Sequence, residues 1–208
     1  MRDEAVDKTL EALHANLKGF IRFDGDRVPV RVIVAPDGHV VAPVMESMLL
    51  SVDVVLELPD DDDVSLQVMV SLERLDPEGE HAGLCDRWRA YHGEPLDVRW
   101  ARMQIDAARL GQWFVDGEAL MQANPLARDE TGILRAVNAA PRSFLKAFCK
   151  ASGAPAEDPV AVGVDPGGID ARRAHDVVRL PFPMRMEGAA QVRSFIEGSG
   201  APFMPGMA

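Results

Sequence analysis

The stretch Asp86–Gly117, DRWRAYHGEPLDVRWARMQIDAARLGQWFVDG, holds the clearest structural pattern in this chain. It reads as the end of a helix, a stop at residues 93–95 (Gly-Glu-Pro), and then two strands folded on each other. From Arg99 onward, small or apolar residues alternate with polar ones and one tryptophan. A period of two is typical of a strand with one buried face. The stretch therefore predicts a β-hairpin that places one face in the core and leaves the other for a ligand.

Short strands and tight turns precede this hairpin. Strands are expected at Phe20–Phe23, Val28–Ala35, His39–Val44, Val52–Leu58 and Val64–Leu75. A helix is expected at Asp3–Leu17, and a second, at Glu80–His92, crosses over between the fifth and sixth strands. About seven antiparallel strands at this spacing favour a barrel closed on itself over a doubly wound sheet.

The charge distribution divides the chain near Pro125. Residues 1–125 carry 12 Lys/Arg and 24 Asp/Glu, a net charge of 12 − 24 = −12, whereas residues 126–208 carry 10 and 9, a net charge of +1. The second part reads as a helix at 129–151 that Pro141 interrupts, three short strands at 160–164, 168–171 and 177–180, and a closing helix at 187–196. The expected domains are therefore 1–125 and 126–208, the latter a small α+β unit.

The overall composition limits the possible partners. A net charge of −11 on 208 residues argues against binding to nucleic acid or to an anionic membrane, because phosphates would be repelled. No apolar run is long enough to span a membrane, and the charged N-terminal segment lacks the apolar core of a signal peptide. The two cysteines, Cys85 and Cys149, lack metal-type spacing and read as buried free thiols. These features predict a cytoplasmic protein.

Arginines beside a tryptophan form the main candidate binding site. Arg99 and Arg102 lie on either side of Trp100, and Arg31 falls in an early strand. Cations beside an aromatic wall suit a flat anionic ligand, such as a flavin phosphate or the propionates of haem. The alternative is that the arginines pair with the many acids of this half and that the tryptophan packs in the core or at a dimer interface.

Two of the five histidines could take part in such a site, although no two are placed at metal-ligand spacing. His92 ends the helix before the hairpin, where the helix C-terminus would favour its charged form. His175 lies in a turn between two strands of the second unit, from which it could reach outward as an axial haem ligand. We find no sequence motif of a hydrolase, a metalloprotease or a phosphate-binding loop.

Two passages resemble a known family. RMQIDAARLGQWFVDGEAL (102–120) is similar to the strand pair of the flavin-binding split-barrel superfamily, of which pyridoxamine-phosphate oxidase is the best-known member. ILRAVNAAPRSFLKAFC (133–149) and VAVGVDPGGIDARRAHDVVRLPFP (160–183) are similar to the small α+β domain that follows the barrel in the haem-utilisation branch. The resemblance implies an α+β fold: an antiparallel split β-barrel of Greek-key type, followed by the small domain.

The resemblance also implies a homodimer that binds FMN or haem between its subunits, possible roles being an oxidoreductase or a haem-handling protein. For such a cofactor, the residues expected to bind it are Arg31, Ser47, His92, Arg99, Trp100 and Arg102, and His175 is the candidate metal ligand. The chain departs from the family at 44–49, where the basic phosphate cradle is replaced by VMESML, and at 138–141, where an acid and a histidine are replaced by Ala140 and Pro141. An alternative is therefore a non-catalytic binding or regulatory protein that kept the fold and lost the cofactor.

Overall fold

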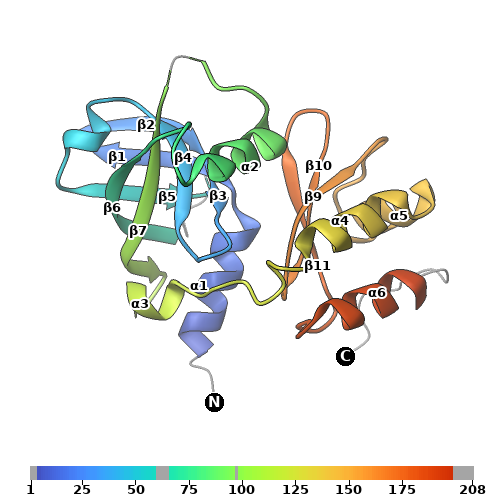
Figure 1. Cartoon of the computed structure of the whole chain (residues 1–208). Coiled ribbons are helices and arrows are strands. Elements are labelled where there is room, and N and C mark those ends of the chain that lie inside the picture. The colour runs from blue at the N-terminus through green and yellow to red at the C-terminus, as the bar shows by residue number, and fades with distance from the viewer. Residues whose placement is uncertain (1–3, 60–65, 97, 199–208) are drawn as a thin grey trace. The chain divides into compact units, whose positions relative to one another are not determined.

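The chain folds into two compact units, Met1–Ala123 and Asn124–Ala208, in a computed structural model that describes residues 4–59, 66–96 and 98–198 (Figure 1). The division falls two residues before Pro125, next to the boundary expected from charge. Each unit has its own hydrophobic core. The expected strand start at 64–65 and the helix start at Asp3 lie outside the described residues.

The first unit is an antiparallel sheet that curls into a split barrel (Figure 1). Its strands are β1 (Lys18–Phe23), β2 (Asp26–Arg31), β3 (Ile33–Val34), β4 (Val40–Val44), β5 (Val54–Leu58), β6 (Leu66–Leu75), β7 (Arg99–Leu110) and β8 (Trp113–Asp116). They are ordered β2-β1-β5-β6-β7-β4-β3, and β8 pairs with β7 beside this path. The helical segments are α1 (Glu4–Ala15), the 3-10 turn η1 (Met48–Leu50), α2 (Ala82–His92) and α3 (Gly117–Leu120).

Strand β7 is the central strand of this sheet, because it pairs with β6, β4 and β8. Opposite Met69 and Val70 the register shifts, and Asp106 becomes the extra residue of a β-bulge. The predicted alternation therefore holds only as far as Ile105, and Ala108 rather than Ala107 is fully buried. The bulged carboxylate accepts a hydrogen bond from the Ser71 hydroxyl at 2.8 Å.

The turn between β3 and β4 matches the expected hairpin at 36–38. The backbone N–H of Ala35 donates to His39 at 2.7 Å, and that of Gly38 donates to Ala35 at 2.9 Å. Gly38 has φ +92°, and a Cβ there would lie 2.7 Å from the backbone nitrogen of Gln122. Only glycine satisfies both the positive φ and this close approach. The expected strand at 28–35 is split, since β2 ends at Arg31 and β3 covers only two residues.

The second unit packs helices against a three-stranded antiparallel sheet. Its elements are α4 (Glu130–Ala139), α5 (Arg142–Ala151), β9 (Val160–Asp165), β10 (Gly168–Arg172), β11 (Val177–Pro181) and α6 (Ala189–Gly198), with strand order β11-β10-β9. The predicted break at Pro141 is confirmed, because it separates α4 from α5. The whole chain is thus the expected α+β arrangement of a split barrel followed by a small α+β domain.

A buried ion cluster holds the β9–β10 hairpin of this second unit against β11. Arg179 on β11 donates to Asp170 at 2.9 Å and also pairs with Asp165. The three side chains are 10–14 % exposed. A Cβ at Gly168 would lie 2.4 Å from the carbonyl oxygen of Leu180. Only glycine at this position therefore lets β10 lie close enough to β11 for Asp170 to meet Arg179.

No helix within the described ranges is both long and apolar enough to cross a membrane.

Candidate functional site

Helix α2 docks on the barrel through Trp88 and His92, and His92 was one of the residues expected to bind a cofactor. The indole N–H of Trp88 donates to the carbonyl oxygen of Arg31 at 2.8 Å, and Nε2 of His92 lies 2.9 Å from the carbonyl oxygen of Val32. Because a carbonyl only accepts, Nε2 of His92 carries a proton in this contact. Trp100 is 5 % exposed and packs edge-on against Trp88, with ring centroids 5.5 Å apart. Trp88 of the helix therefore covers the ring of Trp100, and the backbone of Val32 occupies one ring nitrogen of His92.

Arg102 is held by the turn between β3 and β4. One of its terminal nitrogens lies 2.7 Å from a carboxylate oxygen of Asp37 and 3.1 Å from Nδ1 of His39. Its other terminal nitrogen is 3.9 Å from Glu73 on β6. The arginine side chain is 21 % exposed, so its charge is partly shielded from water. These neighbours fix the orientation of its guanidinium group.

The contact with Arg102 changes the pKa of Asp37. Burial acts to raise the pKa, but the hydrogen bonds from Arg102 and from the backbone N–H of His39 outweigh burial and lower it. Asp37 is therefore ionised at neutral pH and neutralises the arginine charge. An anionic ligand at Arg102 would have to compete with this carboxylate.

Arg99 is engaged in the same way by Glu46, the acid in the place of the family's phosphate cradle. Its Nε donates to Glu46 at 3.0 Å, and Arg74 pairs with the same carboxylate. The hydrogen bond from Arg74 is the largest cause that lowers the pKa of Glu46. Ser47 precedes η1 without a side-chain capping hydrogen bond. The chain's own acid thus lies where a cofactor phosphate was expected.

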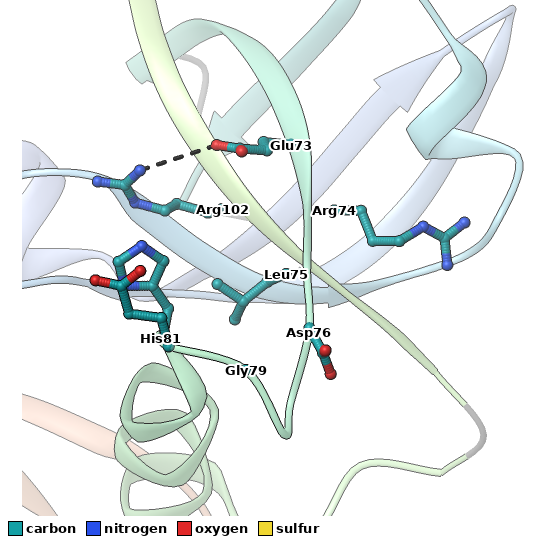
Figure 2. A pocket seen from close by; sticks show the side chains of 8 residues that line it. Glu73, Arg74, Leu75, Asp76, Gly79, His81 and Arg102 are labelled. Carbon is teal, nitrogen blue, oxygen red and sulfur yellow. Dashed lines mark ion pairs between the residues drawn. The ribbon is translucent and has the colours of Figure 1, made fainter.

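A small pocket of 190 Å³ opens beside Arg102 (Figure 2). Figure 2 shows the guanidinium of Arg102 and the carboxylate of Glu73 pointing toward each other at its edge. The lining residues are Glu73, Arg74, Leu75, Asp76, Gly79, Glu80, His81 and Arg102. Pockets for drug-sized ligands usually measure about 300–1,000 Å³, so this one is small for FMN or haem. Of the expected ligand residues, Arg102 alone belongs to its lining.

The remaining expected residues lie elsewhere. Arg31 is exposed on β2 at one edge of the sheet. His175 is exposed in the turn between β10 and β11, which is closed by a bidentate ion pair of Arg173 with Asp176. His175 belongs to the second unit, whereas the other expected residues belong to the first.

Neither a metal-type cluster nor a thiol with a lowered pKa occurs among the described residues. No group of three His, Cys, Asp or Glu side chains among them could hold a metal ion. Cys85 and Cys149 are buried free thiols, and burial raises the pKa of both, which keeps them protonated at neutral pH. Neither cysteine therefore supplies a thiolate for nucleophilic catalysis.

The fold and this region define an α+β protein with an antiparallel split barrel whose basic side chains are largely paired internally. One similar solved structure is that of Atu2129, a protein of unknown function from Agrobacterium tumefaciens str. C58. The two share 18 % sequence identity over 95 % of each chain, with a TM-score of 0.74. At this identity the likeness shows the fold alone. No protein-family model matches the chain, and neither does any curated protein.

Sequence reasoning missed the carboxylates that hold the arginines. The sequence showed Glu46 as an unexpected acid, but the residues around it gave no sign that its partner is Arg99, 53 positions later. Asp37 reads as an ordinary turn residue, and its partner Arg102 is 65 positions away. The pairing of β4 with β7, which sets Val41 opposite Arg102, brings these groups together.

Proposed function

We propose that this chain is a non-catalytic binding protein built on a split barrel, in which the residues expected to hold FMN or haem serve the protein's own structure. One observation carries the proposal: the two arginines expected to meet an anionic cofactor are each bound by a carboxylate of the same chain, Arg102 by Asp37 and Arg99 by Glu46. The packing of Trp88 on Trp100 and the contact of His92 with the carbonyl oxygen of Val32 support it.

The physical reason is competition. A phosphate or propionate gains from an arginine only if it replaces a weaker partner, and here it would have to displace a carboxylate that is already ionised and hydrogen-bonded. The displaced carboxylate would then lose its own partner. A cofactor would thus gain little net free energy from these two arginines.

The test is a titration of the purified full-length protein with FMN and then with hemin, followed by absorption and flavin fluorescence. We expect no saturable change at micromolar ligand. A matched variant, Asp37→Asn with Glu46→Gln, releases both arginines while keeping side-chain size. If pairing is what excludes the cofactor, this variant binds FMN more tightly than the wild type.

Stoichiometric binding of FMN or hemin by the wild-type protein, weakened by Arg102→Gln, would overturn the proposal. It would support the cofactor-binding homodimer that the family resemblance implies, which stays a prediction. Sedimentation of the same samples would then show whether the bound form is a dimer.

A further inference from the structure

The pocket beside Arg102 combines hydrogen-bond donors and acceptors with one apolar wall. Its lining comes from the end of β6, from the turn before α2 and from the first half of β7. Leu75 is 5 % exposed and supplies the apolar wall, and Figure 2 shows it and His81 turned toward the same space as Arg102. This space, here called the Arg102 pocket, measures 190 Å³, which suits a ligand smaller than the drug-sized molecules that fill about 300–1,000 Å³.

Arg102 keeps donors for a ligand although its charge is neutralised. A single terminal nitrogen, Nη2, makes both of its side-chain hydrogen bonds, to Asp37 and to His39. Nη1 lies 3.9 Å from Glu73, which is beyond hydrogen-bond distance, and Nε is buried without a hydrogen-bond partner among the described residues. The arginine can therefore donate from Nη1 to a ligand while it keeps its contact with Asp37.

The acceptors of the Arg102 pocket are available as well. Glu73 is 77 % exposed, and its carboxylate lies 3.9 Å from Arg102 without a hydrogen bond. The side chains of Glu80 and His81 are exposed and make no hydrogen bond or ion pair within the described part of the chain. His81 precedes α2 without capping it through its side chain, so its ring nitrogens remain open to a ligand. A neutral imidazole offers one donor and one acceptor.

This set of groups suits an uncharged ligand better than an ion. An anion would lie beside Glu73 and Glu80 and would have to share Arg102 with Asp37. An ammonium ion offers donors only, so it would leave Nη1 of Arg102 unpaired and repel it. A hydroxyl group both donates and accepts, and it can bridge the 3.9 Å between Arg102 and Glu73. A ligand that carries several hydroxyl groups therefore matches both kinds of lining group.

We propose that the Arg102 pocket binds a small uncharged molecule with several hydroxyl groups, of the monosaccharide or sugar-alcohol class. The inference rests on the proposed function as a binding protein and specifies the chemistry of its ligand. One hydroxyl group accepts a hydrogen bond from Nη1 of Arg102 and donates one to Glu73. Another donates to Glu80 or bonds to His81, and a C–H face of the ligand packs on Leu75.

The experiment titrates the full-length protein with D-ribose, D-glucose and myo-inositol by isothermal titration calorimetry. We expect saturable binding of at least one of them at millimolar concentration, because the lining acids are exposed and water competes for them. The affinity should change little between low and physiological salt, since the ligand carries no charge. Putrescine and inorganic phosphate serve as the small cation and anion for comparison and should bind more weakly.

Two pairs of variants locate the binding site. Arg102→Met and Glu80→Ala should each weaken sugar binding about tenfold, because each removes a charged hydrogen-bonding group from the lining. Arg109→Met and Glu118→Ala are the matched controls. Both of these side chains are exposed, belong to the same unit and lie outside the lining, so sugar binding should be unchanged. Thermal unfolding of each variant should show that it is folded at the temperature of the titration, which separates a binding effect from a folding effect.

Several results would overturn the inference: no binding of any of the three sugars, tighter binding of putrescine or phosphate than of every sugar, or equal sugar binding by Arg102→Met and the wild type. A sugar affinity that falls steeply with salt would overturn it too. The FMN and hemin titrations distinguish the two proposals. If neither cofactor binds and the sugars also fail, the inference about the Arg102 pocket falls alone; if a cofactor binds, the proposed function fails whatever the sugars do.

Discussion

Arg102 in the first unit and Arg179 in the second are both held by aspartates on an antiparallel sheet, but they differ in burial. Arg102 is 21 % exposed and its partner Asp37 is 47 % exposed. Arg179 is 12 % exposed, and its two aspartates are 14 % and 10 % exposed. Although burial acts to lower its pKa, the charges of Asp170 and Asp165 raise the pKa of Arg179 well above its ordinary value.

The comparison shows that the same ion pair serves different purposes at different depths. Near the surface, water competes with the partners, so loss of the pair costs the fold little stability. In the interior, each charge depends on the others because removing one leaves the rest desolvated and unpaired. Arg179 is therefore a structural residue of the second unit, whereas Arg102 can lose its partner without loss of the fold.

Replacing Arg179 by methionine should have the largest effect. The substitution leaves two carboxylates buried without their cation, and breaking such a cluster costs about 3–5 kcal/mol. Urea denaturation should show the second unit unfolding earlier while the first is unchanged. The matched change Arg102→Met should cost less than about 1 kcal/mol; equal losses at the two sites would show that burial does not separate them.

Asp170→Asn should have the second-largest effect on stability. The amide keeps the size of the side chain and one carboxylate remains for Arg179, so only a charge-assisted hydrogen bond is weakened. We expect a loss of about 1.5–3 kcal/mol in the free energy of unfolding. Adding Asp170→Asn to Arg179→Met should partly restore stability, because it removes one of the stranded charges; a purely additive double variant would argue against coupling within the cluster.

Asp37→Asn should have a smaller effect that depends on pH. Because the folded pKa of Asp37 is lowered, its contribution is fully present above its unfolded pKa, about 3.9, and is lost as pH falls through the lower folded pKa. We expect a difference below about 1 kcal/mol at pH 7, since the group is nearly half exposed. Denaturation curves of wild type and variant should converge below pH 3. A difference in stability that persists below pH 3 would show that the substitution acts through packing and not through the charge of Asp37.

Glu46→Gln should have the smallest effect on stability. The carboxylate is exposed and its two arginine partners are about half exposed, so water can take over their hydrogen bonds. The denaturation midpoint should not shift measurably. A clear shift would mean that the Glu46 contacts contribute to stability as the buried Arg179 cluster does, and more than the Arg102 contacts do.

Much of the fold could be predicted from the chain because it follows local rules. A helix cannot run unbroken through Pro141, because proline has no N–H and its ring clashes with the preceding turn, and the Pro-Asp-Gly turn at 36–38 favours a hairpin by its own residue types. The bulge at Asp106 could not be foreseen, because it arises only where β6 and β7 are fitted to each other. It ended the predicted alternation at Ile105, two residues before Ala107.

The candidate site was predicted in its residue types and not in its pairings. Arg99, Trp100 and Arg102 were singled out as a cation–aromatic group, and the structure shows each engaged by another part of the first unit. The weighed alternative of internal ion pairs and packing describes these contacts. The position of Arg22 opposite Arg27 was not anticipated, because these residues face each other only when β1 and β2 are paired in register.

The sequence by itself determined the α+β class, the elements with strong periodicity, the two-part organisation and the excess of negative charge, because each depends on composition or on residues a few positions apart. Only the tertiary structure decided which charges meet. Strand register sets Asp37 beside Arg102 across 65 positions and sets Arg22 opposite Arg27, and burial decides that the fold depends more on Arg179 than on Arg102. Register and burial are properties of the assembled sheet, since they exist only after distant strands have paired.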